Sequence, residues 1–133
     1  MPAAQDRAIL VGVAFGGDAR SEDSLDELDS LATSAGVTAV ARVVARRPRP
    51  DPALCIGSGK AESIGQLLAE RDAGLVIFDN PLSPVQQRNL NRLWGIPVFD
   101  RTELILEIFA QRARSHEGKL QVELARLQYL STR

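Results

Sequence analysis

The chain has 133 residues, of which 44% are hydrophobic and 25% are charged, enough for one domain with a single apolar core and too few for a second catalytic domain. Its 16 basic and 17 acidic side chains leave a formal net charge of −1, which excludes a uniformly basic nucleic-acid-binding chain. Bases nevertheless prevail locally, because five of them stand against one acid between Arg42 and Lys60.

The first half of the chain predicts two strands around one amphipathic helix. Residues 8–15 are almost wholly apolar, the pattern of a strand buried on both faces of a parallel sheet. Leucines and alanines at helical spacing follow, with Ser24 and Glu27 placed as a capping box. Valine-rich residues 37–45 indicate a second strand, and a proline-rich loop after it leads to a short strand expected over 53–56.

The second half continues the alternation. Its apolar patterns predict a helix over 61–72, a strand over 75–79, a helix from 83 to 95, a strand over 96–100 and a helix after it. Ser83, Pro84 and Gln86 form a capping box with proline at the first helical position. An apolar stripe of Leu120, Leu124 and Leu127 predicts a last helix that is still running at Arg133.

Strands that alternate with helices of ten or more residues favour right-handed crossovers and a parallel sheet. We therefore expect an α/β fold of three layers, with a mostly parallel sheet of four to five strands, helices on both faces and the start of a long C-terminal helix. In such folds ligands bind beyond the carboxyl ends of the strands. The loops to examine are thus Gly16–Gly17, Gly57–Lys60, Asp79–Asn80 and Asp100–Arg101.

The loop Ile56-Gly57-Ser58-Gly59-Lys60 has the composition of a phosphate-binding turn, with Gly57, Gly59 and Lys60 as the candidate contacts. It departs from a Walker A loop, because Leu54 and Ala61 replace the required glycine and hydroxyl residue, and from a dinucleotide fingerprint, because Glu62 replaces the third glycine. A tight strand-to-helix turn is the simpler interpretation.

The other chemically versatile residues also have structural interpretations. Asp79 and Asp100 end strands, where they are candidates for a metal or a ribose hydroxyl, but Asp100 with Glu103 also fits a helix N-cap. His116 lacks a second histidine four residues on, so we expect it to face solvent. Cys55 is the only cysteine, which excludes a disulfide, and nothing around it predicts a nucleophile. We expect no catalytic residue and no metal site.

Two groups of basic residues are candidates for phosphate contacts. Arg46, Arg47 and Arg49 are expected on the proline-stiffened loop, and Arg112, Arg114 and Lys119 around a helix junction. Such groups are also common on ordinary solvated surfaces. The sequence holds no signal peptide and no apolar run of roughly 20 residues, so we expect a cytoplasmic protein without a membrane-spanning segment.

Four blocks of sequence carry a family resemblance: IGSGK at 56–60, LSPVQQRNL at 82–90, DRTELIL at 100–106 and IFAQRARSHEGKLQVELA at 108–125. In this order and spacing they resemble the N-terminal domain of the HflX family of ribosome-associated GTPases, from about Arg7 to the chain end. The departures are small, since Asn80-Pro81 stands where an acidic pair is commoner and Ser115 where threonine is usual.

The resemblance implies a factor that binds the large ribosomal subunit and its ribosomal RNA and that splits or rescues stalled ribosomes. It further implies an α/β domain over 7–114 and the first arm of a truncated helical hairpin over 115–133. GTP and Mg²⁺ would be bound by a G domain that this chain lacks. We expect the present chain to need no cofactor, and to have the ribosome and its own missing hairpin and G domain as partners.

Two other functions stay open at this stage. A second, adenine-nucleotide site within this domain would use Gly57, Gly59 and Lys60 on phosphates, with Asp79 or Asp100 nearby. A standalone regulatory domain would need the native protein to end near Arg133, in the middle of the last predicted helix.

Overall fold

The computed structural model describes residues 6–15 and 21–113. Strands and helices alternate strictly in this part of the chain: β1 (Arg7–Phe15), α2 (Ser21–Ser34), β2 (Thr38–Arg47), α3 (Ser58–Glu70), β3 (Leu75–Phe78), α4 (Pro84–Trp94), β4 (Val98–Asp100) and α5 (Arg101–Arg112). The four strands form one parallel sheet in the order β2-β1-β3-β4. The predicted α/β class and parallel sheet are confirmed.

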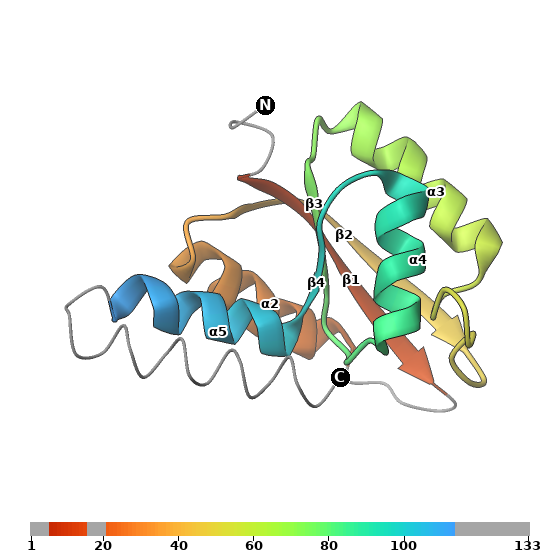
Figure 1. Cartoon of the computed structure of the whole chain (residues 1–133), viewed down its shortest axis with the longest axis horizontal. Coiled ribbons are helices and arrows are strands. Elements are labelled where there is room, and N and C mark those ends of the chain that lie inside the picture. Colours follow the sequence, from red (N-terminus) through yellow and green to blue (C-terminus); the bar gives the residue numbers. More distant parts are fainter. Residues whose placement is uncertain (1–5, 16–20, 114–133) are drawn as a thin grey trace.

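Strand β1 lies inside the sheet and is apolar on both faces, so each face must be covered by helices. On one face Ile9 and Val11 pack with Ile64 of α3 and Leu90 of α4. On the other face Leu10 lies in a second cluster, with side chains from α2 and α5. Figure 1 shows the resulting three layers, with α3 and α4 on one side of the sheet and α2 and α5 on the other.

Two local predictions are wrong. Residues 53–56 form no strand, because the backbones of Asp51 and Cys55 exchange two hydrogen bonds and close a tight turn instead. Helix α2 begins at Ser21, so Ser24 lies in its first turn and does not cap it. The leucine periodicity marks the buried face of α2, and the polar residues before Leu25 carry no signal for where the helix begins.

The ends of the later helices agree with the sequence. At α4 the Ser83 side chain accepts from the Gln86 N–H, Gln86 returns a bond to the Ser83 N–H, and Gly95 ends the helix in the left-handed region. Asp100 and Glu103 form the same reciprocal pair at the start of α5. The Asp100–Glu103 pair fixes where β4 ends and where α5 begins.

The loop at Gly16–Gly17 and the predicted helix with Leu120, Leu124 and Leu127 lie outside the described residues. The proposed hairpin arm over 115–133 therefore stays a prediction. Among the helices within 21–113, none combines the length and the apolar character needed to traverse a bilayer.

Asp100 is 1% exposed, and its two carboxylate oxygens accept from the N–H groups of Leu82 and Glu103. We expect Asp100→Ala to lower the free energy of unfolding by about 1–3 kcal/mol, because the helix cap is lost and a buried donor loses its acceptor. Urea denaturation followed by circular dichroism measures this change. Glu62→Ala on the exposed side of α3 is the matched control, and an equal loss in both variants would contradict the role of Asp100.

Candidate functional site

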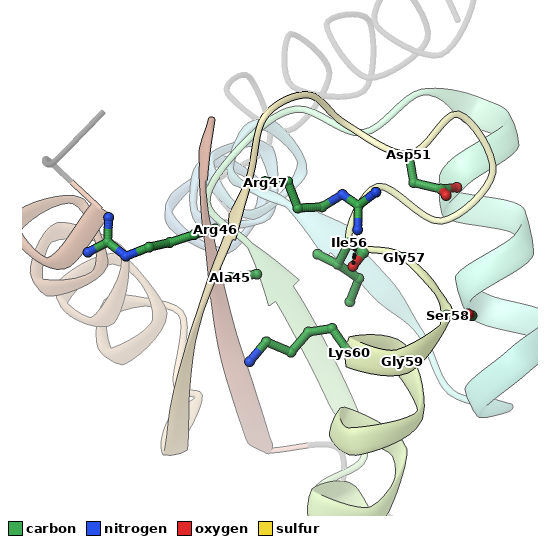
Figure 2. Close-up of a pocket in the computed structure, with 9 residues that line it drawn as sticks. All are labelled: Ala45, Arg46, Arg47, Asp51, Ile56, Gly57, Ser58, Gly59 and Lys60. Carbon is green, nitrogen blue, oxygen red and sulfur yellow. Dashed lines mark hydrogen bonds between the residues drawn. The ribbon is translucent and has the colours of Figure 1, made fainter. Parts of the chain in front are cut away.

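The arginines expected on the proline-rich loop are placed differently by the structure. Strand β2 continues to Arg47, because Arg46 and Arg47 pair with Ala14 and Phe15 at the end of β1. Successive strand residues point to opposite faces of a sheet, so the two side chains diverge. Figure 2 shows Arg46 pointing away from both Arg47 and Lys60. Only Arg49 of this group lies in the loop itself.

A pocket of about 440 Å³ lies between the end of β2 and the start of α3. It is lined by Ala45–Arg47, Asp51 and Ile56–Lys60. Figure 2 shows the Lys60 side chain reaching from the first turn of α3 toward β2, while Arg47 reaches back over Ile56 and Gly57. The structure therefore brings Gly57, Gly59 and Lys60 together with Arg47 in one concave site.

The floor of this pocket is the N-terminus of α3. Gly57 is the N-cap residue, with φ 81° and ψ 160°, and no side chain caps the helix. The first backbone bond of the helix runs from the Ala61 N–H to the Gly57 carbonyl, so the N–H groups of the first turn point outward. No acidic residue lies in that turn. Free N–H groups at a helix N-terminus, next to lysine and arginine, favour an anion.

Arg47 connects the two walls of the pocket. Its Nη1 donates to the Ile56 carbonyl at 3.3 Å, and its Nε donates to the Arg49 carbonyl at 3.3 Å. The guanidinium lies so close to Gly57 that a Cβ atom there would collide with Nη1. Glycine is thus needed at position 57 for its backbone conformation, and an added Cβ would also force the end of the Arg47 side chain to shift.

The proline-rich loop is held by Asp51. Its Oδ1 accepts from the N–H groups of Ala53 and Leu54 at 2.8 and 2.9 Å. These two backbone hydrogen bonds, that to Leu54 first, hold the pKa of the Asp51 carboxyl below its usual value. Helix α4 secures the same loop, since Gln86 Nε2 donates to the Asp51 carbonyl at 2.8 Å.

The two strand-end aspartates have structural partners. Asp79 Oδ1 accepts from Nε and Nη2 of Arg101 at 2.9 and 2.6 Å, and the same Nη2 reaches the Ser24 carbonyl at 3.1 Å. Asp100 caps α5, as its pairing with Glu103 predicts. Within the described residues, no group of three or more potential metal ligands lies close together.

Cys55 is a buried structural thiol. It is 1% exposed, and Asn80 Nδ2 lies 3.4 Å from its Sγ. Burial raises the pKa of the thiol, which disfavours the thiolate that a nucleophile needs. His116 lies outside the described residues.

The second group of basic residues is not assembled with the first. Arg112 lies near the end of α5, where the neighbouring Gln111 donates to the Ala35 carbonyl just before β2 begins. Arg112 is therefore at the amino edge of the sheet, whereas Arg46, Arg47 and Arg49 are at the carboxyl edge. Arg114 and Lys119 lie outside the described residues.

The fit of Gly57 under Arg47 is testable by a double-mutant cycle. We expect Gly57→Ala to lower the free energy of unfolding by about 1–3 kcal/mol, because its backbone conformation is almost restricted to glycine. In an Arg47→Ala background the loss becomes smaller, since the collision is removed. Urea denaturation gives all three values. Gly59→Ala, with nothing within 4 Å of its added Cβ, is the control and stays near wild type; equal losses at both glycines would contradict this geometry.

Comparison with known proteins places the chain in a family. The sequence profile described as GTP-binding GTPase N-terminal matches residues 22–110. GTPase HflX of Escherichia coli strain K12 is 51% identical over 130 residues, which cover 98% of this chain and 30% of that protein. GTPase HflX of Lacrimispora saccharolytica is 46% identical over 129 residues, covering 97% of this chain and 30% of the relative.

A solved structure shows the same fold. A GTP-binding protein from the hyperthermophilic archaeon Sulfolobus solfataricus, in complex with GDP, superimposes with a TM-score of 0.72 at 27% identity, covering 92% of this chain and 36% of that one. The chain spans about 30% of the length of the curated relatives described above. Profile, sequence and fold agree, and the chain therefore belongs to the HflX family of GTPases, to whose N-terminal part it corresponds.

Proposed function

We propose that this chain is the ribosome-docking N-terminal domain of a cytoplasmic HflX GTPase. The full-length protein binds the large ribosomal subunit and splits or rescues stalled ribosomes. GTP hydrolysis, with Mg²⁺, occurs in a G domain outside this chain. The observation that carries the proposal is the match to HflX proteins over almost the whole chain, which covers only 30% of their length.

The basic residues at the carboxyl edge of the sheet supply contacts for ribosomal RNA. Arg46 and Arg49 are exposed and form no ion pair within the described residues, so both are available to phosphates. Arg47 is half-buried, and its Nε and Nη1 donate to the carbonyls of Arg49 and Ile56. It therefore contributes charge and fixes the position of Arg49. Arg112 is a separate exposed contact candidate at the opposite edge, with Arg114 and Lys119 following it in sequence.

Co-sedimentation with purified large ribosomal subunits over a salt series tests this function. We expect salt-sensitive binding, because each phosphate contact releases condensed counterions. Reversing charge at Arg46 and Arg49 together should lower affinity about tenfold at moderate salt and flatten the salt dependence. Reversing charge at Arg88 and Arg92 together, both exposed on α4, is the control with the same change in net charge. Binding that falls equally in both variants, or in neither, contradicts the assigned surface.

The pocket at the start of α3 favours a second function, the binding of an adenine nucleotide. Its free helix N–H groups, Lys60 and Arg47 converge on a concave space of about 440 Å³, the features that hold a phosphate group. Asp79 and Asp100 take no part in this site, because they are bonded to Arg101 and to the start of α5.

Titration with ATP and with GTP in the presence of Mg²⁺, followed by calorimetry, tests the pocket. We expect saturable binding of ATP that Lys60→Ala weakens, because the lysine stands in the first turn of α3 and lines the pocket, while Arg92→Ala leaves it unchanged. The absence of any response at millimolar nucleotide would contradict the second function, and it would leave the ribosome-docking function standing.

A further inference from the structure

The two edge strands differ in whether side chains bond to their outward backbone groups. Edge strand β4 has three residues, and side chains cover its outer groups. Gln87 Nε2 donates to the Val98 carbonyl at 2.7 Å, and Glu103 Oε1 accepts from the Asp100 N–H at 3.4 Å. A short strand covered by side chains is the usual protection against pairing with another chain.

Edge strand β2 is ten residues long and, within residues 6–15 and 21–113, pairs only with β1. Its outward groups follow from the register. The Val11 carbonyl of β1 accepts from the Asp79 N–H at 2.8 Å, on the β3 side. Successive residues of a central strand bond to opposite sides, so the backbone N–H and C=O groups of Gly12 point toward β2. Gly12 lies opposite Val44. In a parallel ladder a residue bonds to the two neighbours of the residue opposite it, and not to that residue itself. The residues whose N–H and C=O groups point away from the sheet are therefore Arg42, Val44 and Arg46.

These outward groups form an open window. At its amino end the window is closed, because Arg71 Nη1 donates to the Val40 carbonyl at 3.3 Å. From Arg42 to Arg46, no side chain of the described ranges bonds to the outer backbone. Arg42 and Arg46 are exposed and Val44 is half-buried. Six backbone donors and acceptors are thus presented in the spacing of a strand, on a surface that water reaches.

We propose that the outer edge of β2, from Arg42 to Arg46, binds an extended acidic peptide segment as a fifth strand. Backbone hydrogen bonds to the three outward residues supply the attachment, as in other cases of strand addition. The inference goes beyond ribosome docking by the arginine side chains, since it assigns a protein partner to the backbone of the strand.

Charge selects an acidic partner. Near the carboxyl end of the window Arg46 points to one face of the sheet, and Arg47 and Lys60 lie on the other. At the amino end Arg42 is already neutralised, because Nη1 and Nη2 pair with Asp26 and Asp29 at 2.5 and 2.7 Å. A carboxylate of the added strand can therefore lie near a basic side chain on either face of the sheet, at the carboxyl end of the window.

A second copy of this chain is the less favourable occupant. Two β2 strands paired antiparallel about Val44 would place Arg46 of each copy opposite Arg42 of the other. The carboxylates beside that Arg42 are already engaged in ion pairs with it, so this pairing offers Arg46 no carboxylate of its own. An acidic strand from another protein supplies one.

Amide hydrogen exchange followed by NMR tests the proposal on the 133-residue chain. The probe is the capped peptide EVTVEVT, which alternates in the manner of a strand, and KVTVKVT is its basic counterpart. With the acidic peptide we expect slower exchange at the amides of Arg42, Val44 and Arg46. The amides of Ala41, Val43 and Ala45 already face β1 and should not change. The basic peptide should bind at least about tenfold more weakly.

N-methylation of the peptide separates strand addition from simple charge attraction without altering the protein. Methylation of alternate amides in one register should abolish binding, and methylation in the other should leave it intact, because only one set of peptide amides faces β2. Equal binding of both methylated peptides, or protection without the alternating pattern, would overturn the proposal. A short single-stranded RNA that protected the same three amides would also overturn it, whereas failure of the peptide leaves ribosome co-sedimentation untouched.

Discussion

Helix α4 holds this domain together through its amide side chains. Four of them donate to backbone carbonyls in two different segments of the chain: Gln86 to Asp51 at 2.8 Å, Asn89 to Ala53 at 3.1 Å, Gln87 to Val98 at 2.7 Å and Asn91 to Ile96 at 2.7 Å. The first two bonds hold the proline-rich loop after β2, and the last two hold the approach to β4. One helix thus fixes both the loop of the candidate site and the covered edge of the sheet.

The same contacts explain why the family resemblance is so specific in residues 82–90. Ser83 and Gln86 cap the helix, Gln86 also holds the loop, and Leu90 is fully buried between α4 and the sheet. The polar positions of this block therefore preserve the fold. Asp100 does the same in the next block, where it caps α5 and accepts from Leu82. A family pattern made of such residues identifies the domain without marking its binding surface.

Much of the fold can be predicted from local sequence patterns. The wrong predictions concern features whose structure depends on residues far away in the sequence. The apolar runs predict β1, β3 and β4, and the Ser83 and Asp100 caps predict where α4 and α5 begin, because each depends on neighbours in sequence. The end of β2 depends instead on how far β1 continues beside it, which local patterns do not show. Arg46 and Arg47 therefore looked like loop residues although they are paired with β1.

The candidate site could be predicted only in part for the same reason. The composition of residues 56–60 indicated a turn suited to phosphate, but Arg47 enters the pocket through the pairing of β2, nine residues before Ile56. The Asp51 turn has a local signal, since aspartate followed by proline favours a side-chain-closed turn. That signal explains the shape of the loop, whereas the bond from Gln86 that anchors it spans 35 residues.

The candidate site lies away from the usual crevice of such folds, toward one edge of the sheet. Parallel α/β sheets commonly bind ligands between the carboxyl ends of the strands at which the chain order reverses, here β1 and β3. In the described residues that position is occupied by Arg101, which joins Asp79 to the Ser24 carbonyl of α2. Among the described residues, the cations left exposed and without an ion pair at this edge are Arg46, Arg49 and Lys60, around the end of β2 and the start of α3. Because Arg101 is engaged in structural contacts at the centre of the carboxyl edge, the exposed cations lie at the β2 side of that edge. The outward backbone N–H and C=O groups of β2 lie at the same side.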